Sequence, residues 1–397
     1  MLHDRIKMSD LAQPQFKANP FSLYAQLRKE APVYPTRFLG RRAWLITRYA
    51  DVTRLLKEDG LVKDWPPATS WLHFVCHPLT HHMLNKDGAD HARLRALAHH
   101  AFKPGLIGQL RTRIQNVCDE LLDKLKTVHE FDLIREFAVP LPCTIINELL
   151  GIPVAERKSL HVRSQSSFTP ATIPEVLLAV PDQRLLTRQI HKLIKWRRRE
   201  PGDDLITALV QAGSEDKLSE DELIASIFFL LIAGQETTTN LIAIGAMVLM
   251  QNLEAKEQFK LNPVLTESAI EELLRYTSPL DVATHRFASE DMTINSAKIS
   301  RGDALFAVLG AANRDESEFP DPDTLNISRT PNKHVAFGQG LHFCLGAPLA
   351  RLEAQVALTT LFRRFPNLQL PQSPKSLSWR KSLFIRGLKG LSVETSE

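Results

Sequence analysis

The sequence feature that most constrains the fold is an apolar stretch from Leu223 to Met250, which is long enough to cross a lipid bilayer. Ser219 and Glu222, just before it, match the capping box that begins a helix, so we predict a helix from about Leu223. The middle of the stretch carries the polar run QETTTN at 235–240, which would lie at mid-bilayer at a high energetic cost. We therefore expect a buried helix of a soluble protein.

Helical spacing also dominates the rest of the chain. Apolar residues recur every three or four positions in the segments 52–56, 94–101, 121–125, 145–150 and 205–209. Strand-like segments with β-branched or aromatic residues occur only at 44–47, 292–295 and 304–308. The sequence contains neither a repeat nor a long polar linker. We expect a single domain over residues 1–397, mainly α with small β-sheets.

Composition and charge exclude several classes of protein. The content of 44% hydrophobic and 24% charged residues is typical of a globular protein. Four cysteines without a C-x-x-C pair do not make a disulfide framework, which favours a reducing compartment. The first residues contain no apolar signal segment, so we expect a cytoplasmic protein with no membrane anchor.

One basic run, Lys192 to Arg199, could form a nucleic-acid patch. The net charge of +4 is small for 397 residues, and the run ends a predicted helix just before Pro201, where positive side chains interact favourably with the helix dipole. We interpret the run as a solvated helix face and expect no nucleic-acid partner.

Glu236 and Thr237 are unusual residues for the middle of a buried helix. Polar groups at such a place either find hydrogen-bond partners or perform chemistry. The structural alternative is that the Thr237 hydroxyl bonds back to the carbonyl of Ala233, four residues earlier. The helix alone leaves both interpretations open.

A second feature, at 337–348, favours chemistry. In the sequence FGQGLHFCLGAP, Cys344 lies among three glycines at the predicted start of a helix, with Pro348 in the first turn. Backbone amides of that turn point toward the sulfur and favour a thiolate, which can serve as a single axial ligand of haem iron. The remaining cysteines, Cys76, Cys118 and Cys143, fit inert thiols.

These residues resemble the cytochrome P-450 family of haem-thiolate monooxygenases, particularly its soluble bacterial members, over essentially the whole chain. The segment from Phe337 to Gly346 fits the family pattern F-x-x-G-x-x-x-C-x-G, and AGQET at 233–237 resembles the family's A-G-x-[DE]-T segment. The resemblance implies that Cys344 is the proximal ligand of haem b, and that Glu236 and Thr237 serve proton delivery during oxygen activation. It implies the cytochrome P-450 fold, with haem between the long central helix and the helix of the cysteine loop.

The resemblance implies further roles for charged residues. Glu272 and Arg275 match the family's E-x-x-R pair, which is structural there, and Arg329 holds the position of its third partner, although Leu325 and Asn326 depart from the usual aromatic residue and Asp. The remaining expected contacts of the haem are His91, Arg95, Arg286 and His342 for the propionates, with Ala233, Gly234, Phe337 and Gly338 also beside the cofactor.

The same resemblance places several segments around an apolar substrate. The segment 61–86, with Trp65, Pro66, Pro67, Trp71 and Phe74, suits a loop over an apolar pocket. Phe168, 173–180, Phe229, Leu230, 280–284 and 383–385 would complete that pocket, with Asp281 and Thr284 as polar groups. Three histidines, His77, His81 and His82, lie near Cys76, but their spacing offers no complete zinc site, and we interpret them as part of a polar, mobile loop.

We therefore expect a monooxygenase that inserts one oxygen atom of dioxygen into a small apolar substrate, by hydroxylation or epoxidation. The sequence contains no reductase domain, so we expect electrons from a separate ferredoxin and ferredoxin reductase, and we expect a monomer. Two alternatives remain: a peroxide-using haem-thiolate enzyme and a non-catalytic haem-binding sensor. Neither needs the pair Glu236 and Thr237, which favours oxygen activation.

Overall fold

The computed structural model describes residues 6–64, 79–99, 102, 104–168, 173–214, 218–371 and 377–395. Helices make up most of it, as the sequence predicts. The helices are α1 (Met8–Leu11), α2 (Pro14–Ala18), α3 (Phe21–Glu30), α4 (Tyr49–Lys57), α6 (Gly88–His99), α7 (Pro104–Asp123), α8 (Pro140–Leu150), α9 (Val154–Phe168), α10 (Ile173–Arg199), α11 (Leu205–Ser214), α12 (Glu220–Gln251), α13 (Leu253–Leu261), α14 (Thr266–Thr277), α15 (Leu309–Ala312) and α16 (Ala347–Arg364).

The strands are short. They are β1 (Val33–Phe38), β2 (Arg41–Ile46), β3 (Leu61–Val62), β4 (Glu130–Asp132), β5 (Arg286–Ala288), β6 (Met292–Ile294), β7 (Ala297–Ile299), β8 (Ala304–Ala307), β9 (Leu368–Gln369) and β10 (Ser392–Thr395). They form a sheet in the order β1-β2-β8-β5-β3, a second in the order β4-β10-β9, and the pair β6-β7.

The prediction of strands at only three places is therefore wrong, although β2, β6 and β8 do lie at those places. Most of the missed strands span two or three residues, which is too short to show an alternating pattern. The longest, β1, is an edge strand and contains Pro35, which breaks the usual strand signal but is tolerated at a sheet edge.

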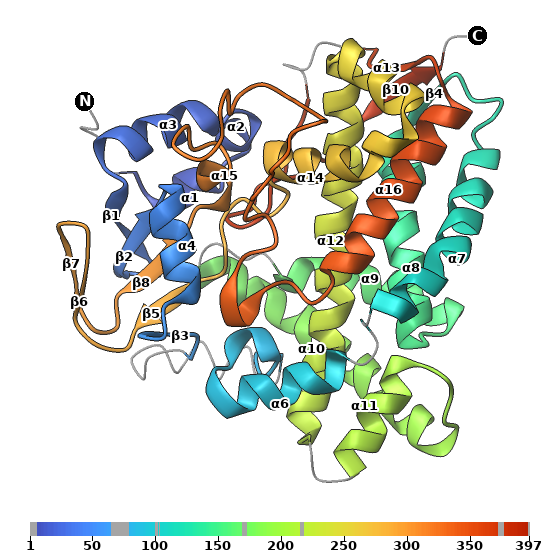
Figure 1. Cartoon of the computed structure of the whole chain (residues 1–397). Coiled ribbons are helices and arrows are strands. Elements are labelled where there is room, and N and C mark those ends of the chain that lie inside the picture. The colour runs from blue at the N-terminus through green and yellow to red at the C-terminus, as the bar shows by residue number, and fades with distance from the viewer. Residues whose placement is uncertain are drawn as a thin grey trace.

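The long helix α12 is the centre of the fold. It begins at Glu220, one turn before the predicted start, and its capping box is formed: the Glu222 amide donates to Ser219 Oγ at 3.2 Å, and the Ser219 amide to Glu222 Oε2 at 2.9 Å. Figure 1 shows α12 running through the molecule, with α16 crossing it on one side and the β1-β2-β8-β5 sheet to the left. By length and composition α12 could cross a membrane, but 72% of its apolar stretch is buried, as in a core helix.

Candidate active site

One cavity brings together residues that are far apart in the sequence. Its walls come from α6, α12, the segment before β5, and the loop that leads into α16. Ten of the predicted site residues line it: His91, Arg95, Ala233, Gly234, Thr237, Arg286, Phe337, Gly338, His342 and Cys344. Glu236 is not among the lining residues, although it neighbours Thr237 in sequence.

The cysteine loop is held in shape by its own backbone. The Cys344 amide donates to the Phe337 carbonyl at 3.0 Å, and Gly338 and Gly340 adopt φ values of +69° and +71°, which glycine reaches without strain. At Gly340 a Cβ atom would lie 2.6 Å from the Leu56 carbonyl oxygen, so a side chain would collide with the end of α4. Glycine is therefore required there by both conformation and space.

The environment of the Cys344 sulfur contains opposing influences. Burial raises the pKa of the thiol, while the amides of Gly346 and Ala347 and the charges of Arg95 and Arg351 act to lower it. The expectation that the loop alone favours a thiolate is thus correct for the amides, but burial outweighs them. A coordinated metal ion overcomes this cost, because a thiol that ligates a metal is deprotonated.

Arg351 supports the loop from α16, a role that the sequence did not indicate. Its guanidinium lies 4.6 Å from the centre of the Phe337 ring and donates to both Glu271 oxygens at 2.7 Å. Burial would raise the pKa of Glu271, but the hydrogen bonds from Arg351 and His334 lower it to about 2. The ion pair thus connects α14 to the side of the loop that carries Phe337.

His91, on α6, has unpaired ring nitrogens. Its residue surface is fully buried, and neither Nδ1 nor Nε2 has a hydrogen-bond partner. Burial, with the charges of His342 and Arg95, lowers its pKa to about 4. His342 lies beside it, with 4.3 Å between the ring centres, and contacts Asp87 at 3.4 Å. A buried polar side chain without a partner, at the wall of a cavity, indicates that a ligand supplies the partner.

Two arginines at the same wall lack acidic partners within the described residues. Arg95 donates to the Phe343 carbonyl at 2.8 Å, and Arg286, only 6% exposed, makes no ion pair there. Burial lowers the pKa of Arg286 to about 10. Both face a cavity that also contains the unpaired His91, so this wall is well suited to bind carboxylates.

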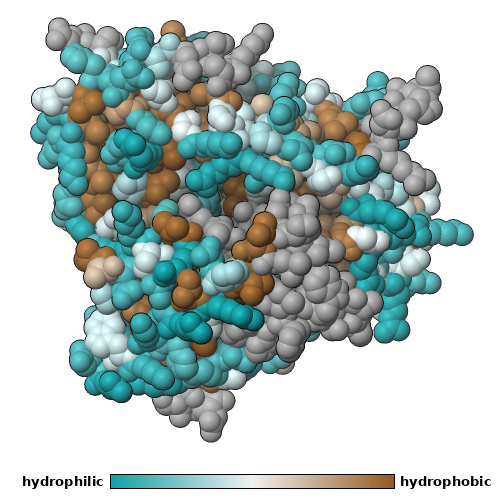
Figure 2. Space-filling view, turned by 180° about the vertical axis from the view of Figure 1, so that it is seen from behind, coloured by the Kyte–Doolittle hydropathy of each residue, from teal (hydrophilic) through white to brown (hydrophobic). Residues whose placement is uncertain are grey.

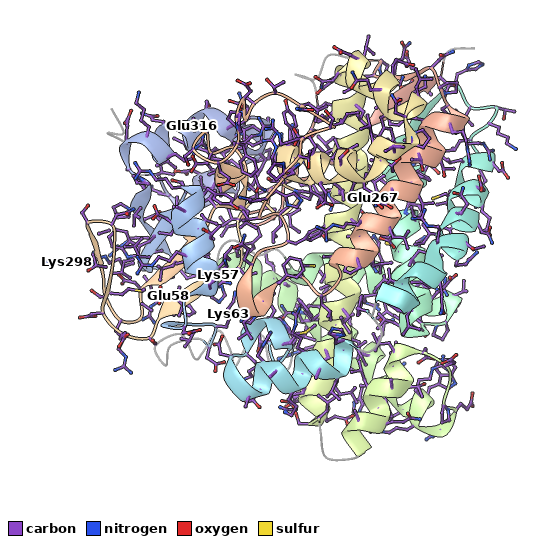
Figure 3. All side chains as sticks on the ribbon, in the orientation of Figure 1. Lys57, Glu58, Lys63, Glu267, Lys298 and Glu316 are labelled. Carbon is purple, nitrogen blue, oxygen red and sulfur yellow. The ribbon has the colours of Figure 1, made fainter. Side chains whose placement is uncertain are left out.

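Lys63, labelled in Figure 3, is a further cation at the cavity that the sequence did not single out. It is 2% exposed and donates to Thr284 Oγ1 at 2.7 Å and to the carbonyls of Thr284 and His285 at 3.1 and 2.9 Å. Burial, with the neighbouring Arg286 charge, lowers its pKa well below the usual value. Thr284 lines the cavity as predicted, with one acceptor position already used by this lysine.

Thr237 and Glu236 have different surroundings. The Thr237 hydroxyl lines the cavity and donates to the Ala233 carbonyl at 3.1 Å, the bond that the structural alternative expects. Glu236 Oε2 instead accepts from Arg380 Nη1 at 2.9 Å. Arg380 lies in the segment before β10, and no motif in the sequence marked it.

Glu272, Arg275 and Arg329 form a buried network away from the cavity. Arg275 donates to Glu272 at 2.8 and 2.7 Å, and Arg329 Nε donates to Glu272 Oε2 at 3.1 Å. Arg275 also donates to the carbonyls of Asn313, Pro322 and Thr324. Despite the unusual sequence before Arg329, the Asn326 amide donates to Glu272 Oε1 at 2.9 Å. The three predicted residues are therefore in contact.

The predicted substrate walls are found in part. Phe229, Leu230, Leu280, Ala283 and Thr284 line the cavity. Asp281 does not: it is buried away from it, where Lys17 Nζ and Tyr24 Oη donate to Oδ2 at 2.6 and 2.8 Å. The segment 383–385 is absent from the described lining, since Leu383 packs with β1 and β8 instead, and Leu178 is 79% exposed to solvent. Residues 65–78 and the side chains of 165–177 lie outside the described residues.

The interpretation of His82 as part of a polar mobile loop is wrong. Its ring is buried and stacks on Phe229, with 4.6 Å between ring centres and 13° between planes. Burial, with the charges of His81 and Lys63, lowers its pKa to about 3. Among the described residues no group of three or more His, Cys, Asp or Glu could hold a metal ion; Cys76 and His77 lie outside them.

Comparison with known proteins identifies the family. A sequence profile described as Cytochrome P450 matches residues 8–158 and 263–393. Polyketide biosynthesis cytochrome P450 PksS of Bacillus subtilis is 40% identical, over 96% of this chain and 97% of its own, and 6-deoxyerythronolide B hydroxylase of Saccharopolyspora erythraea is 35% identical, over 97% and 98%. The crystal structure of myxobacterial cytochrome P450 CYP267B1 in complex with myristic acid, 37% identical, superimposes with a TM-score of 0.93 over 98% of this chain and 99% of that one. The predicted fold is confirmed, and the chain belongs to the cytochrome P450 family of haem-thiolate monooxygenases.

Proposed function

We propose that this monooxygenase hydroxylates or epoxidises an apolar, acyl-type substrate, with Cys344 as the iron ligand and Thr237 and Glu236 as proton-delivery groups. The observation that carries the proposal is the shared cavity. Cys344 and Thr237 line it from different segments. Basic side chains without an acidic partner among the described residues line one wall, and apolar side chains of α12 and the segment before β5 line another. An enzyme needs this combination to hold a charged cofactor beside an apolar substrate.

The residues present fit haem b, which is the cofactor of the family. Cys344 offers the sulfur ligand, and the unpaired nitrogens of His91 with the cations of Arg95 and Arg286 would hold the two propionates. His342 would join them, while Ala233 and Gly234 leave room because their side chains are small. Phe337 and Gly338 complete this side of the cavity.

When bound, the haem supplies the activation of dioxygen, favoured by an electron-donating thiolate. The protein's own residues determine where protons are supplied. The Thr237 hydroxyl lies at the cavity and can pass a proton from its Oγ1 when its bond to Ala233 is exchanged. Glu236 accepts from Arg380, so we assign to Arg380 the control of when this carboxylate takes up a proton and passes it on.

The enzyme uses dioxygen and redox partners, as its family does. We propose that the electron donor is a ferredoxin reduced by a ferredoxin reductase, bound at basic residues near the Cys344 loop. We further propose that the protein is a soluble, cytoplasmic monomer with one domain over residues 1–397. The burial of α12 supports a soluble protein, and a cavity lined jointly by α6, α12 and the loop before α16 supports a single domain.

Relatives support an acyl-type substrate. One solved relative holds myristic acid, and another, 34% identical with a TM-score of 0.90, is P450BioI in complex with an acyl carrier protein ligated by hexadec-9Z-enoic acid. PksS belongs to polyketide biosynthesis by name. Long, mainly hydrocarbon chains suit walls made of Met83, Leu84, Phe229, Leu230 and Leu280.

Two substitutions test the assignment of the site. Cys344→Ala should abolish the thiolate-type absorption of the reduced carbon monoxide complex, while Cys118→Ala and Cys143→Ala keep it. With ferredoxin and reductase present, Thr237→Ala should retain haem and ligand binding yet lower the rate of product formation by roughly a hundredfold. It should also lower the product formed per NADPH consumed. Normal coupling with a lower melting temperature would return Thr237 to a structural role, and turnover with peroxide but not with reductant would favour the peroxide-using alternative.

A further inference from the structure

The exposed face of α10 carries a stripe of positive charge that neither the fold nor the proposed chemistry uses. The stripe consists of Arg184, Arg188, Lys192, Lys195 and Arg199, all exposed. At about 100° per residue these five side chains fall within an arc of about 80°, opposite the buried face of the helix, and extend over about 22 Å. None of them makes an ion pair or hydrogen bond with a described residue.

Stability does not explain the stripe. Like charges four residues apart on a helix repel one another, and Arg184, Arg188 and Lys192 form two such pairs in succession. The helix dipole favours cations only in the last turn, which accounts for Arg199 but not for Arg184 or Arg188. The acidic residue near the helix, Glu220, pairs with residues outside the stripe: it accepts a hydrogen bond from Arg198 and contacts His191. The stripe residues of the run from Lys192 to Arg199 are exposed, as the interpretation of that run as a solvated face expects, but Arg184 and Arg188 extend the positive charge toward the N-terminus, where the dipole does not account for it.

Apolar side chains extend the stripe on one edge. Leu185 is 40% exposed and Leu178 is 79% exposed, and both lie about 20° to 40° beyond Lys192 around the helix. The face is therefore basic along most of its length and apolar beside its N-terminal half. Such a mixed face suits another protein surface, where cations give orientation and apolar contacts give affinity.

Nucleic acid and membrane fit this face less well. Proteins that bind single-stranded nucleic acid place free aromatic rings among the cations, but Trp196 stacks on Arg197 at 3.8 Å and donates to Glu200. A membrane-binding helix needs a broad exposed apolar face, whereas the main apolar face of α10 packs against α9, α11 and α12.

The position of α10 also separates it from the cysteine loop. α10 packs against one side of α12, and α16, which follows Cys344, packs against α12, α7 and α14. In Figure 1, α10 passes behind α12, so it lies toward the face seen in Figure 2, where hydrophilic and hydrophobic side chains are interspersed. A partner bound there leaves the Cys344 side free for the electron donor.

We propose that the α10 stripe docks an acidic carrier protein that delivers the acyl substrate covalently attached. This rests on the proposed function only in that the substrate is an acyl chain. The partner is defined by its chemistry: a small protein with a negatively charged helix facing the five cations, and an attached chain long enough to enter the cavity. Attraction between the two surfaces raises the rate of encounter and weakens with added salt.

The test compares two charge-reversed proteins, each prepared with haem. Arg188→Glu with Lys192→Glu removes the middle of the stripe; Lys29→Glu with Lys298→Glu makes the same change in net charge on α3 and on the β6-β7 hairpin, at the left edge of Figure 3. The probe is a fluorescent acyl carrier protein loaded with a hexadecenoyl chain, and binding is followed by anisotropy at several salt concentrations. Free hexadecenoic acid is titrated in parallel by the visible absorption of the haem.

We expect wild-type protein and the control to bind the carrier equally, with affinity falling as salt rises, and the stripe variant to bind about tenfold more weakly or worse. Free hexadecenoic acid should bind all three alike. Equal carrier binding by all three, equal losses in both variants, or no carrier binding at all would overturn the proposal. If the stripe variant instead loses sedimentation with phosphatidylglycerol vesicles and keeps carrier binding, the stripe is a membrane contact and the proposal is wrong. Failure of the free acid alone, with carrier binding intact, would contradict the proposed substrate and not the docking surface.

Discussion

Two groups of charged and polar side chains differ in whether the protein itself supplies their hydrogen-bond and ion-pair partners. Around Glu272, each carboxylate oxygen accepts from arginine, and Arg275 uses its remaining donors on backbone carbonyls. At the cavity wall, Arg95 and Arg286 have no acidic partner among the described residues, and both His91 nitrogens are unpaired. Buried charges that are paired inside the protein hold the fold, whereas basic and polar side chains left without such partners at a cavity indicate a ligand that supplies them.

The largest effect is expected from breaking the completed group. Glu272→Ala leaves the fully buried Arg275 without its carboxylate, which should lower the free energy of unfolding by about 3–5 kcal/mol. Urea denaturation of the haem-loaded protein measures this loss. As a control, Asp123→Ala removes exposed contacts with Arg364 and Lys126, which water screens, and should cost much less than Glu272→Ala. Similar losses in the two variants would contradict the distinction.

The incomplete group should respond in the opposite way. Arg286→Met removes a buried cation that lacks a protein partner, so the apoprotein should be no less stable than the wild type. Its affinity for haem should fall by roughly tenfold to a hundredfold or more, since a charge-assisted hydrogen bond contributes about 1.5–3 kcal/mol. Haem transfer to apomyoglobin measures the loss. A destabilised apoprotein with unchanged haem transfer would place Arg286 among the structural charges.

A smaller effect concerns buried neutral histidines near the cavity. Burial lowers the pKa of His82 and of His285 from 6.5 to about 3. Below pH 6.5 the unfolded chain therefore binds protons at these residues that the folded protein does not, and stability falls as the pH drops. Between pH 6.5 and 5.5 each should cost about 1 kcal/mol. The pKa of Glu271 is lowered from 4.5 to about 2, so its contribution to stability is lost at still lower pH, as the pH falls below about 4.5.

Thermal unfolding across this pH range checks the effect. His82→Phe keeps a ring against Phe229 and removes the titrating group, so its stability should depend less steeply on pH than that of the wild type. An unchanged slope would mean that folding does not lower the pKa of His82.

Most contacts between residues that are close together in sequence could be predicted from the sequence. The capping box at Ser219, the loop around Cys344 and the pair of Glu272 with Arg275 depend on neighbours within a few residues, and the structure contains each of them. The contacts missed, Glu236 with Arg380 and Lys63 with Thr284, join segments whose separation in sequence is 144 and 221 residues. No local pattern reports such pairs, because they follow from the packing of whole elements.

A long separation in sequence also explains why the assignment of Asp281 to the substrate pocket is wrong. Its neighbours in sequence, Leu280 and Ala283, do line the cavity, but the carboxylate points to Lys17 and Tyr24 near the other end of the chain. His82 is a comparable case. Its segment contains other polar residues, but its ring is covered by Phe229 on α12, which lies far away in sequence.

The contact between Glu236 and Arg380 has a consequence for biosynthesis. The ribosome makes the chain from its N-terminus, so α6 and α12 emerge well before Cys344, and Arg380 follows later still. Until the Arg380 segment has been made, the ion pair that joins it to Glu236 on α12 cannot form. The sulfur of Cys344 meets the walls from α6 and α12 only once the chain has been translated through the cysteine loop, so the site that would hold the haem is completed late in synthesis.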